Sequence, residues 1–127
     1  MQPNSDERLA DLIGELRAFV AERDWGRFHD PKNLSMLVAS EAGELAAVLR
    51  WVDNGDADEV AKRDPTLLTL SDEIADVAIG LLLLCDRLGV DFIEVSRRKV
   101  ARNRLRYPVE QSRGVAERPS VAASKAP

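Results

Sequence analysis

The sequence contains only one cysteine, Cys85, and one histidine, His29, among its 127 residues. A single cysteine cannot form a disulfide within the chain, which is typical of a reducing compartment such as the cytoplasm. The longest apolar run, Val77 to Cys85, is too short to span a bilayer. The first residues lack the basic and apolar regions of a signal peptide. We therefore expect a cytoplasmic protein with no membrane association.

Positive charges are outnumbered by negative ones, and aromatic side chains are scarce. The chain has 18 Lys and Arg against 22 Asp and Glu, and aromatic residues make up 5% of it. A net charge of −4 gives no overall attraction to nucleic acid, so we expect no nucleic-acid partner. The length fits one domain with one modest core. Apolar residues recur at helical spacing in several segments, which predicts helices there.

Two pairs of acids interrupt the apolar stripes of predicted helices. Glu41 and Glu44 are three residues apart, as are Glu73 and Asp76, so the carboxylates of each pair share one helix face. The first pair falls in a stripe of Leu and Val that faces the core, and the second lies in a run that is apolar on nearly every side. An unpaired carboxylate in such a place is costly unless something neutralises it.

The spacing of the two pairs brings them level with each other. We predict helices over residues 5–22, 33–52, 65–88 and 91–106, and a short polar helix within 56–63. Each acid pair lies eight residues from the connector between its helices, which is about 12 Å at 1.5 Å per residue. If these helices fold back antiparallel, four carboxylates converge. Oxygen-only ligands favour Mg²⁺, with Mn²⁺ as the alternative, over zinc.

Aromatic and cationic residues accompany the acids. The loop at 24–32 is rich in aromatic and polar side chains, and the last predicted helix is basic from residue 97 onward. Metal and cations hold a polyphosphate, and aromatic rings stack on a base. These residues indicate a metal-dependent hydrolase of a phosphate anhydride. The simpler alternatives are a loop stapled to the core and a solvated basic helix face.

These residues carry a family resemblance over about residues 5–110. The two acid pairs, in their order along the chain, resemble the signature of MazG-like nucleoside triphosphate pyrophosphohydrolases. Residues 99–108, KVARNRLRYP, match the C-terminal motif of that family. Residues 22–34, ERDWGRFHDPKNL, together with Trp51, resemble its dCTP pyrophosphatase branch.

The resemblance implies an all-α, four-helix MazG-like bundle that forms a homo-oligomer, either a dimer or a tetramer. It implies Mg²⁺-dependent hydrolysis of (deoxy)nucleoside triphosphates, dCTP or related pyrimidine dNTPs, to the monophosphate and pyrophosphate. The implied metal ligands are Glu41, Glu44, Glu73 and Asp76, with Glu41 and Glu44 also catalytic. The implied substrate contacts are Trp25, Arg27, Phe28, His29, Asn33, Trp51, Lys99, Asn103, Arg106 and Tyr107. Residues 1–108 then form the enzyme domain, and 109–127, which lack periodicity, a flexible tail.

Two positions depart from the dCTP branch. Gly80 stands where that branch has an aromatic hydroxyl side chain, and Leu16 where it has a histidine. Both concern the base or sugar pocket, and we hypothesise that Gly80 makes room for a larger base. Three other functions are considered: a non-catalytic nucleotide sensor, a sister pyrophosphohydrolase acting on another nucleotide, and a dinuclear iron or manganese bundle. The last is disfavoured because the only histidine lies in a loop.

Overall fold

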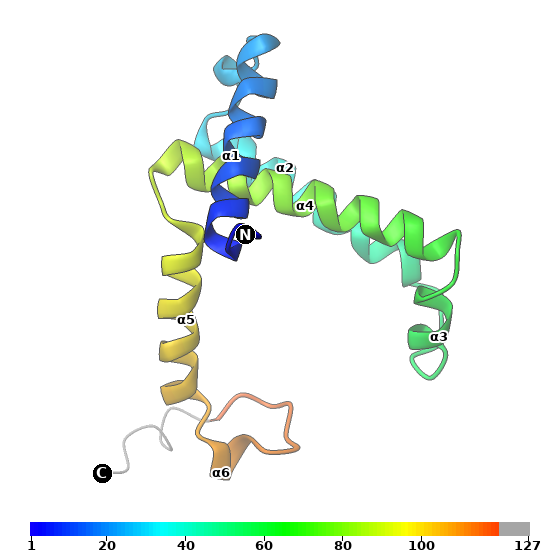
Figure 1. Cartoon of the computed structure of the whole chain (residues 1–127). Coiled ribbons are helices and arrows are strands. Elements are labelled where there is room, and N and C mark those ends of the chain that lie inside the picture. Colours follow the sequence, from blue (N-terminus) through cyan, green and yellow to red (C-terminus); the bar gives the residue numbers. More distant parts are fainter. Residues whose placement is uncertain (120–127) are drawn as a thin grey trace. The chain divides into compact units, whose positions relative to one another are not determined.

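The computed structural model describes residues 1–119, and within them every regular element is helical (Figure 1). The elements are α1 (Ser5–Glu22), the 3₁₀ segment η1 (Gly26–Phe28), α2 (Pro31–Leu49), α3 (Ala57–Ala61), α4 (Thr66–Leu88), α5 (Phe92–Arg106) and α6 (Val109–Ser112). The predicted all-α fold is confirmed. None of the described helices is long and apolar enough to cross a membrane. The chain divides into two compact units, Met1–Val90 and Asp91–Pro127.

Helix α1 begins at the predicted residue because a capping box fixes its first turn. The Asn4 side chain accepts a hydrogen bond from the backbone N–H of Glu7 at 2.8 Å, and the Glu7 carboxylate accepts one from the N–H of Asn4 at 2.9 Å. Just beyond the other end, Asp24 has a φ of 53°. This left-handed conformation, which Asp tolerates better than most residues, turns the chain from α1 into η1.

Helix α2 begins two residues earlier than predicted because Asp30, not Asn33, is its N-cap. The Asp30 carboxylate accepts a hydrogen bond from the N–H of Asn33 at 2.9 Å, and Pro31 occupies the first turn. The Asn33 side chain is therefore free for another task. Its Nδ2 donates to the carbonyl of Phe28 at 3.1 Å and ties the η1 segment to the start of α2.

Helix α4 ends, and helix α5 begins, where the sequence signals predict, whereas the N-cap of α4 is Pro65 and not the predicted Asp64. Helix α4 begins one residue after the predicted position and is followed by Gly89, whose φ of 65° is a conformation that glycine adopts at little cost. The Asp91 side chain then accepts a hydrogen bond from the N–H of Glu94 at 2.9 Å, which starts α5. Gly89 thus ends α4 and Asp91 starts α5, so a short connection is enough between the two long helices.

In the first unit, α2 and α4 lie side by side and antiparallel, connected through α3 at one end, while α1 packs on α4 (Figure 1). Leu34 on α2 and Leu82 on α4 are the buried apolar side chains among the described residues. Gly80 is also buried, and a Cβ placed on it would lie 3.0 Å from Cγ2 of Val38. The missing side chain therefore allows α2 and α4 to approach closely.

The second unit contains α5 and α6. Helix α6 occupies the start of the segment 109–127 that the sequence predicts to be a flexible tail. Residues 120–127 of that segment lie outside the described residues. The long helices of the first unit are α1, α2 and α4, so the four-helix bundle and the oligomer stay predictions.

Candidate metal centre and adjoining cavities

The packing of α2 against α4 brings acidic side chains together. One carboxylate oxygen each from Glu41, Glu73 and Asp76 lies within 4.8 Å of the other two. We call these three residues the acid group. Glu41 comes from α2 and the other two from α4, so the group exists only because these helices run antiparallel in register.

The acid group is electrostatically unfavourable by itself. Oε2 of Glu41 and Oε2 of Glu73 are both buried and have no hydrogen-bond partner. Burial raises the pKa of both carboxyls above the ordinary value, and the negative charges of Glu44 and Asp76 raise it further. Glu44 is exposed and stands outside the group of three, yet its charge acts on both buried carboxylates.

These residues fit a divalent cation. Two buried oxygens without donors need a positive partner, since carboxylates only accept hydrogen bonds when ionised. All the donor atoms are carboxylate oxygens, the ligand type preferred by hard cations. The distances among the three oxygens permit one ion to contact all of them.

A cavity of about 380 Å³ opens beside the acid group, since both Glu41 and Asp76 line it. We call it the aromatic cavity. Phe19 and Trp25 both line it, in an edge-to-face pair with ring centroids 5.6 Å apart and an interplanar angle of 74°. Its apolar wall comes from α1, α2 and α4, namely Leu12, Leu16, Val20, Leu37, Ile79 and Leu83. Its remaining polar side chains are Glu15 and His29.

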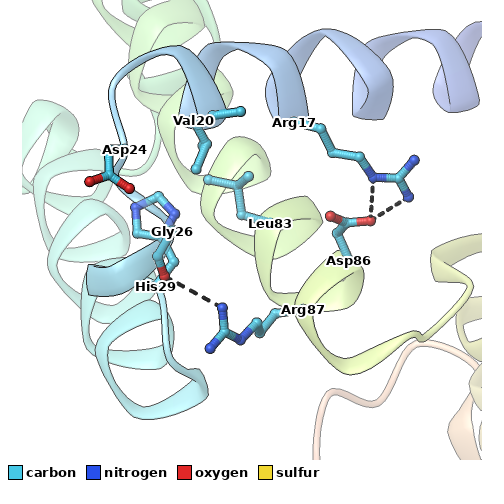
Figure 2. A pocket seen from close by; sticks show the side chains of 9 residues that line it. Arg17, Val20, Asp24, Gly26, His29, Leu83, Asp86 and Arg87 are labelled. Carbon is cyan, nitrogen blue, oxygen red and sulfur yellow. Dashed lines mark hydrogen bonds and ion pairs between the residues drawn. The ribbon is translucent and has the colours of Figure 1, made fainter.

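A second cavity of about 440 Å³ lies between α1, η1 and α4; we call it the arginine cavity (Figure 2). In it, Nε of Arg17 donates to Oδ1 of Asp86 at 2.8 Å, which links α1 to α4. The Arg87 guanidinium donates to the carbonyl of Gly26 at 3.4 Å, which links α4 to η1. Since these cationic side chains already bond to protein groups, the cavity is part of the scaffold that positions the loop.

His29, Val20 and Leu83 line the arginine cavity (Figure 2), and the same three residues also line the aromatic cavity. These three residues therefore form the wall between the aromatic cavity and the arginine cavity. The hydrogen bonds of Arg17 and Arg87 lie on the arginine-cavity side of this wall. These two hydrogen bonds link α1 and η1 to α4 beside the wall to which His29 belongs.

The structure brings two of the loop residues predicted as substrate contacts, Trp25 and His29, to the aromatic cavity. The others do not line it or the arginine cavity. Arg27 forms an ion pair with Asp24, and Phe28 is exposed. Asn33 positions the loop through its hydrogen bond to the Phe28 carbonyl. Trp51 follows α2 and is 87% exposed, and it lines neither cavity.

The remaining predicted contacts belong to the second unit. Lys99, Asn103 and Arg106 lie on α5, and Tyr107 caps its C-terminus. Nε of Arg118 donates to the Tyr107 hydroxyl at 3.3 Å, and this hydrogen bond lowers the pKa of Tyr107. Asn103 and Tyr107 are half-buried, whereas Lys99 and Arg106 are exposed. Their role with phosphates stays a prediction.

Sequence reasoning missed the contribution of α1 to the cavity. Leu12, Glu15 and Phe19 line it, although the sequence pattern predicts that the apolar side of α1 packs in the core. A carboxylate next to that apolar stripe was the available signal. Gly80 also lines the cavity, but a side chain there would meet Val38. The geometry therefore gives this glycine a packing role and does not support the hypothesised extra room for a larger base.

Comparisons with known proteins agree on one group of relatives. Residues 41–119 match the model of the MazG-like family. The chain is 40% identical over 113 residues to dCTP pyrophosphatase 1 of Rattus norvegicus, covering 88% of this chain and 66% of the relative. It is 36% identical over 110 residues to the Homo sapiens protein of the same name, covering 86% of this chain and 65% of the relative. The chain thus spans just under two thirds of the length of these relatives.

A solved structure gives the same indication at the level of the fold. The crystal structure of a pyrophosphatase from Archaeoglobus fulgidus DSM 4304 superposes with a TM-score of 0.73 at 35% sequence identity. The match covers 85% of this chain and 96% of that one.

Proposed function

The chain belongs to the MazG-like family, and from this premise we propose that it hydrolyses deoxynucleoside triphosphates, dCTP or a related pyrimidine nucleotide, to the monophosphate and pyrophosphate. The observation that carries the proposal is the acid group, with its two buried oxygens lacking partners, beside a cavity walled by aromatic rings. The names of the relatives, dCTP pyrophosphatase 1 and pyrophosphatase, support the reaction and the substrate class.

Magnesium is the proposed cofactor, with manganese as the alternative. Glu41, Glu73 and Asp76 hold the ion, and Glu44 completes or adjusts the ligand set. When bound, the ion supplies positive charge that offsets the charge of the phosphate oxygens. The protein contributes the fixed spacing of its carboxylates, which the packing of α2 on α4 provides.

Glu44 and Glu41 are the proposed catalytic residues. Glu44 is exposed and lies outside the acid group, so we assign it the task of orienting and deprotonating the attacking water while the acid group holds the ion. Glu41 lines the aromatic cavity and belongs to the acid group, so it lies where the phosphates and the ion meet. Phosphoryl chemistry of this kind needs positioning and charge neutralisation more than a covalent nucleophile.

The base occupies the aromatic cavity in this proposal. Trp25 and Phe19 offer ring faces and edges for contact with a nucleobase, and His29 offers a polar contact. Because Glu41 and Asp76 line the same cavity, a base held there directs its triphosphate toward the acid group. Lys99, Asn103, Arg106 and Tyr107 remain the proposed phosphate contacts of the second unit.

A substrate panel tests the proposed function. The full chain is incubated with dCTP, dUTP, dTTP and the purine dNTPs, with Mg²⁺ or with EDTA, and the products are separated by chromatography. We expect dCMP and pyrophosphate only with the metal. We expect Glu44→Gln to abolish turnover without loss of helicity, whereas Asp58→Asn on α3 should leave turnover unchanged. Nucleotide binding without any product in the wild type would favour the sensor instead.

The proposed oligomer uses a seam along α4. Leu67, Ile74, Leu81 and Leu88 recur every seven residues and are all exposed, with Ile74 57% exposed. Apolar residues also stand three positions after the first three of them, so the seam has the a and d spacing of a helix that pairs with a second copy. We expect Leu81→Glu to dissociate the oligomer in light scattering, whereas Val115→Glu does not. A wild-type monomer would contradict this.

A further inference from the structure

Glu15 is a carboxylate in the aromatic cavity that the proposed reaction does not use. It lines the cavity from α1 as an exposed residue, and its side chain forms no ion pair and no hydrogen bond among the described residues. We propose that Glu15 reads the base by accepting a hydrogen bond from its exocyclic amino group. This assignment rests on the proposed function, and it makes Glu15 a specificity-determining residue.

The other side chains that line the cavity are less suited to accept a hydrogen bond from the amino group of the base. Glu41 and Asp76 belong to the acid group and face the proposed metal. His29 forms the wall toward the arginine cavity, where Arg87 and the Gly26 carbonyl hold the neighbouring backbone. Every further lining residue is apolar or aromatic and has no strong acceptor. Glu15 is therefore the free hydrogen-bond acceptor on the side of the cavity that α1 forms.

The chemistry of a carboxylate decides which bases fit. An ionised carboxylate accepts hydrogen bonds and cannot donate one. The N4 amino group of cytosine is a donor, whereas uracil and thymine carry the O4 acceptor at the equivalent position. A carbonyl facing Glu15 would leave two acceptors in contact, which is unfavourable in an apolar cavity. The cavity should therefore prefer an amino-bearing pyrimidine to its keto counterpart.

The two positions that depart from the dCTP branch make this inference more specific. Leu16 lines the cavity beside Glu15 and provides no polar atom, and Gly80 has no side chain. Neither residue can form a hydrogen bond to the base through its side chain. Discrimination between cytosine and uracil therefore falls to the polar side chains His29 and Glu15. A neutral histidine both donates and accepts, whereas an ionised carboxylate only accepts, so Glu15 is the one that favours an amino group over a carbonyl.

The test compares two substrates that differ at this edge of the pyrimidine ring. kcat/KM is measured for dCTP and dUTP with the wild type, Glu15→Gln and Asp11→Asn. Asp11 is the matched control because it is an exposed acid one turn earlier on α1 that does not line the cavity. We expect Glu15→Gln to lower the dCTP to dUTP ratio about tenfold, since an amide can also donate to O4. Asp11→Asn should keep the wild-type ratio.

Binding of the products gives a second readout that does not depend on turnover. Dissociation constants of dCMP and dUMP are measured for the wild type, Glu15→Gln and Glu15→Ala. A selectivity for dCMP that disappears in both variants supports the proposal. An unchanged dCTP to dUTP ratio and unchanged dCMP selectivity would overturn the role of Glu15 while leaving the enzyme proposal intact. A wild type that hydrolyses no nucleotide would instead overturn the proposed function.

Discussion

The two units of the chain carry opposite charge. The first unit has eighteen Asp and Glu residues against nine Lys and Arg, and the second has nine Lys and Arg against four Asp and Glu. The acids that matter in the first unit meet through the packing of two helices. The cations of the second unit follow one another along a single helix, α5. The acids thus depend on tertiary packing to come together, whereas the cations are brought together by the sequence of one helix.

This difference has an energetic consequence. The buried Oε2 atoms of Glu41 and Glu73 have no hydrogen-bond partner among the described residues, so their burial carries a free-energy cost that a cation would offset. Lys99 and Arg106 are exposed, so water solvates them whether or not a ligand is bound. Removing one acid of the acid group should therefore lower kcat, whereas removing one cation of α5 should only weaken the binding of the nucleotide.

The largest expected effect is that of Glu73→Gln. We expect kcat to fall about 10³-fold, because the substitution removes a charge from the acid group where the metal and the phosphate meet. In EDTA the melting temperature should rise, because a buried, repelled carboxylate has been removed. The exposed neighbour Asp72 provides the control, and Asp72→Asn should keep most of the activity. Equal losses in the two variants would contradict the assignment.

Arg106→Gln should have a smaller effect and a different kinetic signature. We expect KM to rise about tenfold with little change in kcat, because an exposed guanidinium contributes attraction to the triphosphate more than it stabilises the reaction. The difference from the wild type should shrink at high salt, which screens exposed charges. Steady-state kinetics at two ionic strengths measure both effects. A fall in kcat like that of Glu73→Gln would place Arg106 in the chemistry instead.

The stability of the metal-free protein should decrease as pH rises. The pKa values of Glu41 and Glu73 are raised above the ordinary value in the folded chain, mainly by burial, so the folded state retains protons that the unfolded state has released. The stability that these protonated carboxyls provide is present below the unfolded pKa and is lost as pH passes the folded pKa. Magnesium should reverse the trend, because it replaces the protons.

Thermal melts at pH 5 and pH 8, each with EDTA or with Mg²⁺, measure this linkage. The stabilisation by Mg²⁺ should be larger at the higher pH. Glu73→Gln serves as the control, since it should reduce both the pH dependence in EDTA and the response to the metal. If wild type and variant changed equally between the two pH values, the acid group would not be the origin of the effect.

The smallest effect is expected in the arginine cavity. Asp86→Asn weakens the link between α1 and α4, but Arg17 is mostly exposed, and exposed ion pairs contribute little. We expect the melting temperature to fall by less than about 4 °C. The kcat should stay within twofold of the wild type, because the tie is remote from the acid group. A large loss of kcat would mean that this tie positions His29 for catalysis.

Local signals predicted most of the fold. The capping residues of α1 and α5, and the glycine after α4, lie in the sequence where the helices begin and end. The error at α2 arose because Asp30 and Asn33 are both good caps, and only the structure shows which one accepts the bond. Convergence of the acids was predictable because helix rise and connector position fix how far along each helix an acid lies.

What the sequence did not reveal depends on tertiary contacts. An amphipathic stripe has the same pattern whether it covers a core or one side of a cavity, so Phe19 gave no separate signal. Trp51 was assigned to the substrate through a family motif, but within one chain it is exposed and away from both cavities. The packing of Gly80 on Val38 is a distance between two helices that no local pattern encodes.

The edge-to-face arrangement of Trp25 on Phe19 has a practical consequence. The chain contains two tryptophans, and only Trp25 lines the aromatic cavity. Replacing the solvent-facing Trp51 with Phe leaves a single indole whose fluorescence originates at the cavity wall. A nucleobase stacking there should quench that emission, so the protein contains its own optical reporter of ligand arrival, readable in a stopped-flow instrument without a dye.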